Sequence, residues 1–148
     1  MLSPDPGLAQ TAHLYRSLRS LDLPLSVVDN THLHKRLLSA ARSLGDLRRK
    51  QKLFFGQAGM FSDPAWDILL SIFIDEGSSR PSYVKSVTVG AELPDTTALE
   101  WIRRLEHCGL IVGRPDPADR RRRLLSLTPS GRNGIVAVLL SLLAEVGQ

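Results

Sequence analysis

The feature that most constrains this chain is a change of sequence period at Gly109. Apolar residues recur at helical spacing before it, whereas two short apolar runs follow it, Leu110 to Val112 and Leu124 to Leu127. Short apolar runs bounded by turn residues indicate strands. Between the two runs, residues 114–123 hold two prolines, two aspartates and five arginines, a composition typical of an exposed turn. The pattern predicts a β-hairpin with a strongly basic tip.

The segment before this hairpin, residues 95–108, predicts a helix, because its apolar residues recur on one face. Asp95 or Thr96 is expected to cap its start. A break at residues 92–94 separates it from a short segment, residues 83–91. Two helices joined by a tight break are the layout of a helix-turn-helix.

A further helix is predicted upstream, beginning at Ser62-Asp63-Pro64. Proline suits the first helical position, where its missing N–H costs no hydrogen bond. Residues 66–74 are apolar nearly all round, and Gly77 to Pro81 ends the pattern. We therefore expect this helix to be the central buried one.

A long helix is predicted nearer the N-terminus, from an N-cap at Asp29 or Asn30 to about Phe55. Its apolar stripe suits packing against another helix of the same chain or of a second chain. The stripe consists of Leu33, Leu37, Ala40, Leu44, Leu47 and Phe54. The outer face is strongly basic and either is solvated or faces phosphate. That face consists of Lys35, Arg36, Arg42, Arg48, Arg49, Lys50 and Lys52, with Asp46 as its one acidic residue.

The last predicted helix begins with Thr128 as its cap and Pro129 in its first turn. From Ile135 to Leu143 it is apolar on every side except Ser141. A chain of this size is not expected to cover such a helix by itself, which indicates a subunit interface. We also expect a short amphipathic helix within the N-terminal arm, on the spacing of its leucines at 14, 18 and 21.

The predicted organisation is an N-terminal arm, a long dimerisation helix, a winged helix-turn-helix lobe and a C-terminal dimerisation helix. These parts span residues 1–28, 29–58, 62–128 and 129–148. The formal net charge of +4 favours an anionic partner. A single cysteine cannot form an intramolecular disulfide, which favours the reducing cytoplasm. We expect neither a signal peptide nor a membrane span, since the longest apolar stretch falls short of the roughly 20 residues that a bilayer requires.

Two stretches resemble the MarR family of bacterial transcription regulators. Leu105 to Ile111 is similar to that family's helix-to-strand junction. Asp116 to Arg121, followed by Leu125 to Gly131, resembles its wing signature, an Asp-x-Arg and then a Leu-Thr-x-x-Gly, at a matching spacing. The resemblance covers residues 62–134 well, and residues 30–58 only as a long helix in the right place.

The resemblance implies a homodimer whose terminal helices form the interface. It implies a recognition helix at about Asp95 to His107, which enters the major groove of DNA, and a wing arginine, Arg121, which reaches the minor groove. Asp119 is expected to orient the wing by pairing with a nearby arginine. The residues expected to bind DNA are Thr96, Thr97, Glu100, Arg103, Arg104, Arg120, Arg121 and Arg122.

Glu100 departs from the family pattern, which often has a basic residue in the middle of the recognition helix. A carboxylate there either accepts a hydrogen bond from cytosine N4 or repels phosphate. Residues 95–108 carry three acidic side chains against two arginines. This acidic surplus favours an alternative, a winged-helix adaptor that binds protein rather than DNA. A third possibility is a sensor of oxidants or small molecules, whose effector pocket lies between the dimerisation helices and the DNA-binding lobe.

The sequence shows no nucleophile with a base and an orienting group, and no phosphate-binding glycine loop, so we expect no enzyme activity and no cofactor. The four histidines are scattered, and His32 and His34 are two residues apart, which places them on different helix faces. We therefore expect no metal site. Cys108 is expected to be a buried structural residue rather than a redox switch.

Together these patterns predict a mostly α fold of about six helices, a winged helix-turn-helix with a small antiparallel β-hairpin wing and flanking dimerisation helices. The predicted function is that of a DNA-binding transcriptional regulator, which binds double-stranded DNA as a homodimer through its recognition helix and arginine-rich wing.

Overall fold

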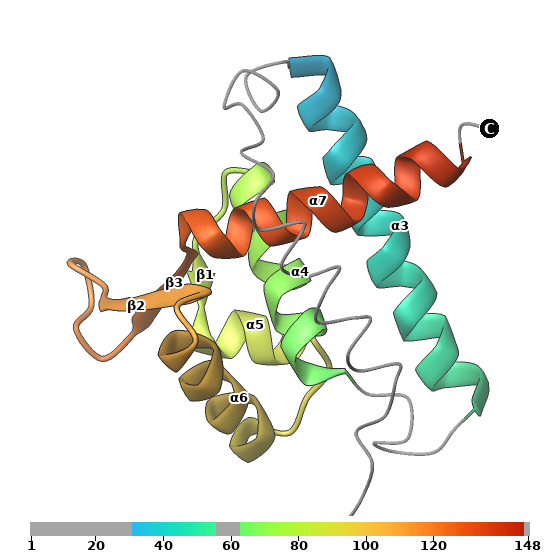
Figure 1. The fold of residues 1–148 in the computed structure, drawn as a ribbon. Helices are drawn as coiled ribbons and strands as arrows, with labels where there is room; N and C mark the ends of the chain where they lie inside the picture. Colours follow the sequence, from blue (N-terminus) through green and yellow to red (C-terminus); the bar gives the residue numbers. More distant parts are fainter. Residues whose placement is uncertain (1–30, 56–62, 147–148) are drawn as a thin grey trace, which may run out of the picture.

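The computed structural model of the chain describes residues 31–55 and 63–146 (Figure 1). The expected N-terminal arm, its short helix and the cap at Asp29 or Asn30 lie outside these residues. The described elements follow in the order α3 (Thr31–Phe55), α4 (Pro64–Gly77), β1 (Ser82–Tyr83), α5 (Val84–Gly90), α6 (Asp95–His107), β2 (Ile111–Pro115), β3 (Arg123–Leu127) and α7 (Pro129–Val146). The predicted fold, a mostly helical winged helix with a small antiparallel sheet, is confirmed.

Helix α4 lies at the centre, as its sequence predicts, and contacts α3, α5, α6, α7 and the sheet. Pro64 occupies its first turn, and the Asp63 carboxylate caps it by accepting from the Trp66 N–H at 3.2 Å. Ile68 and Ile72 of this helix are completely buried. In Figure 1, α7 crosses α3 and α4 on one side, whereas α5 and α6 lie on the other side with the hairpin projecting beside them.

The sheet has the strand order β1-β3-β2, and both pairings are antiparallel. Strands β2 and β3 form the predicted hairpin, with Gly113 opposite Leu125. Strand β1 was not predicted, because two residues are too few for an alternating pattern to be visible. Its Ser82 also lies opposite Leu125, so β3 is the middle strand.

Three details of the helices differ from expectation. Pro94 rather than Asp95 or Thr96 occupies the N-cap position of α6, and no side chain caps this helix. Arg48 does not belong to the outer basic face of α3, because it turns inward to form an ion pair with buried Asp67 of α4. Leu47, assigned to the apolar stripe, is 54% exposed.

The expectation that the chain alone cannot cover α7 is wrong for most of the helix. Ile135, Val136, Ala137 and Leu139 are buried in the core of a single protomer, since α3 and α4 pack against this helix. Val138 remains 40% exposed. None of the helices in the described part of the chain is long and apolar enough to cross a membrane.

Candidate nucleic-acid interface

Helix α6 buries one face and exposes the other. Ala98, Ile102 and Leu105 are buried against the core, as expected. Thr96, Glu100, Arg103 and Arg104 are exposed, whereas Thr97 is half-buried. The predicted residues of this helix therefore lie mainly on its solvent face, where a duplex has access to them.

Two of these residues are engaged with each other. Arg104 Nη2 lies 2.7 Å from Glu100 Oε1, one helical turn away. The Arg104 guanidinium also stacks 4.7 Å from the centroid of the Trp101 ring. These contacts hold both charges in place, so the unpaired arginine of the helix's exposed face in the described structure is Arg103.

The tip of the hairpin is built by two aspartates. Asp116 accepts from the Ala118 N–H at 2.9 Å, and its own N–H donates to the Arg122 carbonyl at 3.0 Å. Asp116 is buried rather than exposed in the turn, contrary to expectation, because these contacts turn it inward. The Asp119 carbonyl accepts from the Arg122 N–H at 3.0 Å, which closes the turn.

Asp119 orients the wing arginines, as predicted. Its carboxylate lies 3.2 Å from Arg121 Nε and 3.5 Å from Arg122 Nε. The Arg121 side chain is nevertheless 92% exposed, and Arg120 is exposed beside it. The Arg122 guanidinium lies 5.2 Å from the centroid of the Tyr83 ring, which fixes it over β1. The aspartate thus orders the arginine chains while it leaves their charge accessible.

Arg123 turns back toward α6. Its Nη2 lies 2.9 Å from Glu106 Oε1, an ion pair without the alignment of a good hydrogen bond. The glycine at position 113 makes room for this pair, because a Cβ there would lie 2.5 Å from Arg123 Nη2. Gly113 therefore has a structural role, because it leaves space for the ion pair between β3 and α6.

The wing is joined to the body through the Leu-Thr-x-x-Gly stretch. Thr128 caps α7, as predicted, by accepting from the Gly131 N–H at 3.1 Å. It also donates from its N–H to the Leu110 carbonyl at 3.1 Å and from Oγ1 to the Gly109 carbonyl at 2.6 Å. Gly109 has φ = 75°, which favours glycine, and ends α6 as expected.

Glu76 of α4 makes a second connection between the wing and the body of the protein. No local sequence pattern predicts this contact. Glu76 Oε1 accepts from the Leu127 N–H at 2.9 Å, and its Oε2 pairs with Arg132 of α7. One carboxylate thereby fixes β3 and α7 relative to the central helix. The three elements are distant in sequence, so only the folded chain reveals the contact.

A groove of about 1000 Å³ lies between α5, the first half of α6 and the wing. Its basic lining comes from Lys85, Arg121, Arg122 and Arg123, and Asp95 contributes the acidic group. The predicted DNA-binding residues thus divide into two groups. Arg121 and Arg122 line the groove, whereas the others lie outside its lining: Arg120 of the wing and Thr96, Thr97, Glu100, Arg103 and Arg104 of α6.

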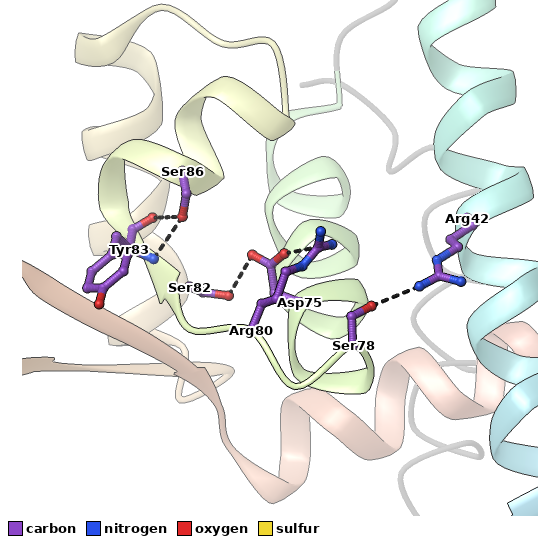
Figure 2. Close-up of polar contacts among 7 residues, drawn as sticks. All are labelled: Arg42, Asp75, Ser78, Arg80, Ser82, Tyr83 and Ser86. Atoms are coloured by element: carbon purple, nitrogen blue, oxygen red, sulfur yellow. Dashed lines mark hydrogen bonds and ion pairs between the residues drawn. The ribbon is translucent and has the colours of Figure 1, made fainter.

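A separate cavity of about 350 Å³ lies between α3, α4 and α5. Figure 2 shows polar contacts beside it. Asp75 accepts from Ser82 Oγ at 3.0 Å and lies 3.5 Å from Arg80 Nη2, while Arg42 of α3 donates to Ser78 Oγ at 2.9 Å. These contacts connect the long helix α3 to the end of α4, and α4 to strand β1.

Cys108 is exposed, so the expectation of a buried structural cysteine is wrong. It is the C-cap of α6 and directly follows the helix's last residue, His107. Among residues 31–55 and 63–146, no group of three or more His, Cys, Asp or Glu side chains lies close enough together to hold a metal ion.

A family model described as a winged helix DNA-binding domain matches residues 61–131. This segment contains α4, the helix-turn-helix and the wing. No match was found among curated proteins.

The chain is also similar to solved structures of transcriptional regulators. The transcriptional repressor CouR, bound to a 23-mer DNA duplex, is 25% identical with a TM-score of 0.43, and the match covers 53% of this chain and 51% of that one. The regulator Tm0710 from Thermotoga maritima is 25% identical over 76% of each chain, with a TM-score of 0.48. The MarR family regulator SP03579 is 16% identical over 97% of this chain and 79% of its own, with a TM-score of 0.49.

The chain thus spans about half of the CouR structure and more of the other two. The matched family model describes a DNA-binding domain and not an enzyme. Residues 61–131 are thus similar to winged helix DNA-binding domains, as the sequence predicts, and the solved structures that resemble the chain include a MarR family transcription regulator.

Proposed function

We propose that this chain is a transcriptional regulator that binds double-stranded DNA as a homodimer, with α6 in the major groove and the wing at the minor groove. One observation carries the proposal: the exposed arginines Arg121 and Arg122 of the wing line one groove together with residues of both helices of the helix-turn-helix, α5 and α6. Phosphate attraction supplies most of the affinity of such an interface, and contacts to base edges supply its specificity.

Each predicted residue has a role in this proposal. Arg120, Arg121 and Arg122 follow the minor groove and its phosphates. Thr96 and Thr97, at the start of α6, donate to phosphate. On the solvent face of the same helix, three charged residues approach base edges: Glu100, Arg103 and Arg104.

The ion pairs of α6 weaken the alternative of a protein-binding adaptor. That alternative depends on the acidic surplus of residues 95–108. Glu100 is paired with Arg104, and Glu106 is paired with Arg123. The acidic charge that would repel a duplex is therefore largely compensated within the lobe.

Loss of wing charge tests the DNA interface. We expect the double variant Arg120→Ala/Arg121→Ala to weaken binding to every duplex and to reduce the salt slope by about one to two units, because each arginine that binds a phosphate releases about one counterion. Binding is measured by fluorescence anisotropy over a series of salt concentrations.

The matched control for this test is Lys35→Ala/Arg36→Ala, which removes the same charge from the exposed face of α3. The control is expected to bind like the wild type. If both double variants lose affinity equally, net charge rather than the wing determines binding. An unchanged slope in the wing variant means that the wing does not contact DNA.

The proposed homodimer is supported by apolar side chains on the second half of α3. Leu47, Leu53 and Phe55 are 54%, 78% and 61% exposed. Sedimentation of the full chain at micromolar concentration is expected to give a dimer, and Leu53→Asp is expected to favour the monomer. Leu139 is unsuitable for this test, because it is completely buried within one protomer. A wild-type monomer contradicts the proposal.

A second candidate function is regulation by a small molecule, and the cavity between α3, α4 and α5 favours it. A volume of about 350 Å³ falls within the range of small-ligand sites. It lies where an effector pocket was expected, between the long helix and the DNA-binding lobe. Thermal unfolding in the presence of a panel of small molecules is expected to identify a stabilising ligand, and Gly90→Leu, at the cavity wall, is expected to abolish that shift.

A further inference from the structure

The groove between the helix-turn-helix and the wing contains two apolar side chains that face solvent. Val89 of α5 is 69% exposed, and Leu99 of α6 is 42% exposed. Both line the same groove as Lys85, Arg121 and Arg122. Single apolar residues are common on protein surfaces, but two of them in one concave, basic groove on the DNA-binding lobe require an explanation.

The position of Leu99 on α6 indicates which part of a bound duplex would contact it. It lies beside the buried positions Ala98 and Ile102, on the flank of the helix that faces the wing. Glu100 and Arg103, which are exposed on the same helix, are charged. A duplex that contacts these charged residues and the wing therefore brings the edge of its major groove against the apolar flank.

The major groove offers one apolar group to such a surface. Each base pair presents a characteristic set of donors and acceptors there, and thymine adds its C5 methyl group. The basic side chains around the groove complement the phosphates on either side of the bases. The occupant that fits both properties is duplex DNA with a thymine methyl group in contact with the apolar side chains.

We propose that Leu99 and Val89 are specificity-determining residues that read thymine methyl groups in the bound DNA site. This inference rests on the proposed DNA-binding function. Burial of one methyl group against an aliphatic side chain corresponds to an affinity change of about three- to fivefold.

The test removes the methyl group without altering base pairing. A preferred duplex is first selected from a random library with the full-length wild-type chain. Each thymine of that duplex is then replaced in turn by deoxyuridine, and affinities are measured by fluorescence anisotropy. We expect about three- to fivefold weaker binding at one or two positions and no change at the other positions.

Variants assign the effect to the two side chains. Leu99→Ala and Val89→Ala are expected to bring the thymine-to-uracil affinity ratio at those positions close to one. The control is Val112→Ala on β2, since Val112 is as exposed as Leu99, at 42%, but does not line the groove. This control is expected to keep the wild-type ratio.

Equal affinity of the wild type for thymine and uracil duplexes at every position overturns the inference but leaves the DNA-binding function intact. Variants that keep the full ratio also overturn it, because other residues then read the methyl group. A wild-type chain that binds no duplex overturns the proposed function itself. The uracil series uses the wild type only, so the inference stays testable if a variant does not fold.

Discussion

Gly131 provides a sharp test of how the wing is attached to the body. It lies in the first turn of α7, directly against the carbonyl of Leu110 at the start of the hairpin. A Cβ at this position would lie 2.1 Å from the Leu110 oxygen and 3.0 Å from its carbonyl carbon. These atoms belong to the backbone, so the contact cannot be relieved by a side-chain rotation.

The effect of Gly131→Ala on stability can be worked out from these contacts. Alanine gains about 1 kcal/mol over glycine within a helix. Against this gain, overpacking costs about 1–3 kcal/mol. Separating α7 from the hairpin also breaks two hydrogen bonds of Thr128, to Leu110 and Gly109, each of which contributes about 1 kcal/mol. The variant is therefore expected to be about 2–4 kcal/mol less stable than the wild type.

Gly134 is the matched control, because it lies one turn further along α7 and a Cβ there meets nothing within 4 Å. We expect Gly134→Ala to raise the free energy of unfolding by up to about 1 kcal/mol. Urea unfolding followed by circular dichroism, at one fixed protein concentration, measures both variants. If Gly131→Ala is as stable as the wild type, the close approach to Leu110 does not exist.

Three further variants test other parts of the lobe. Gly113→Ala is expected to change the free energy of unfolding by less than about 1 kcal/mol, because the flexible guanidinium of Arg123 can move away from the new methyl group. The released arginine is then expected to steepen the salt slope of DNA binding by about one unit. Gly109→Ala is expected to lower the free energy of unfolding by about 1 kcal/mol, because alanine is strained at φ = 75°. Glu76→Ala is expected to cost about 1–3 kcal/mol, since it leaves the N–H of Leu127 without its acceptor. Urea unfolding measures the free energy of unfolding of all three variants. A Glu76→Ala variant as stable as the wild type would show that this carboxylate does not stabilise the lobe.

The elements that sequence predicts well are those with a strong local pattern. The hairpin follows from two apolar runs around a proline- and aspartate-rich turn, and α4 begins at the Asp63-Pro64 signal. Strand β1 has two residues and no such pattern, because β3 rather than its own sequence determines its pairing. Local sequence also gave the wrong prediction for the burial of α7, because α3 and α4, which are distant in sequence, pack against its apolar side chains.

The candidate site was predictable in its residue types but not in its pairings. Exposed arginines on the wing and an exposed face on α6 follow from charge and helical period. The pair of Arg123 with Glu106 and the pair of Arg48 with Asp67 each join separate elements. Neither pair leaves a signal in the local sequence. The exposure of Cys108 likewise depends on how α6 ends at the surface.

Binding of duplex DNA by the basic groove of the winged helix, through phosphate contacts, is tested most directly by a titration across salt. The full-length chain is titrated with a duplex of random sequence from low to physiological salt. We predict that the logarithm of the binding constant falls linearly with the logarithm of salt concentration, with a slope of about −0.9 for each phosphate contact and several contacts in total. No binding to any duplex at low salt, where phosphate attraction is strongest, would contradict the proposed function.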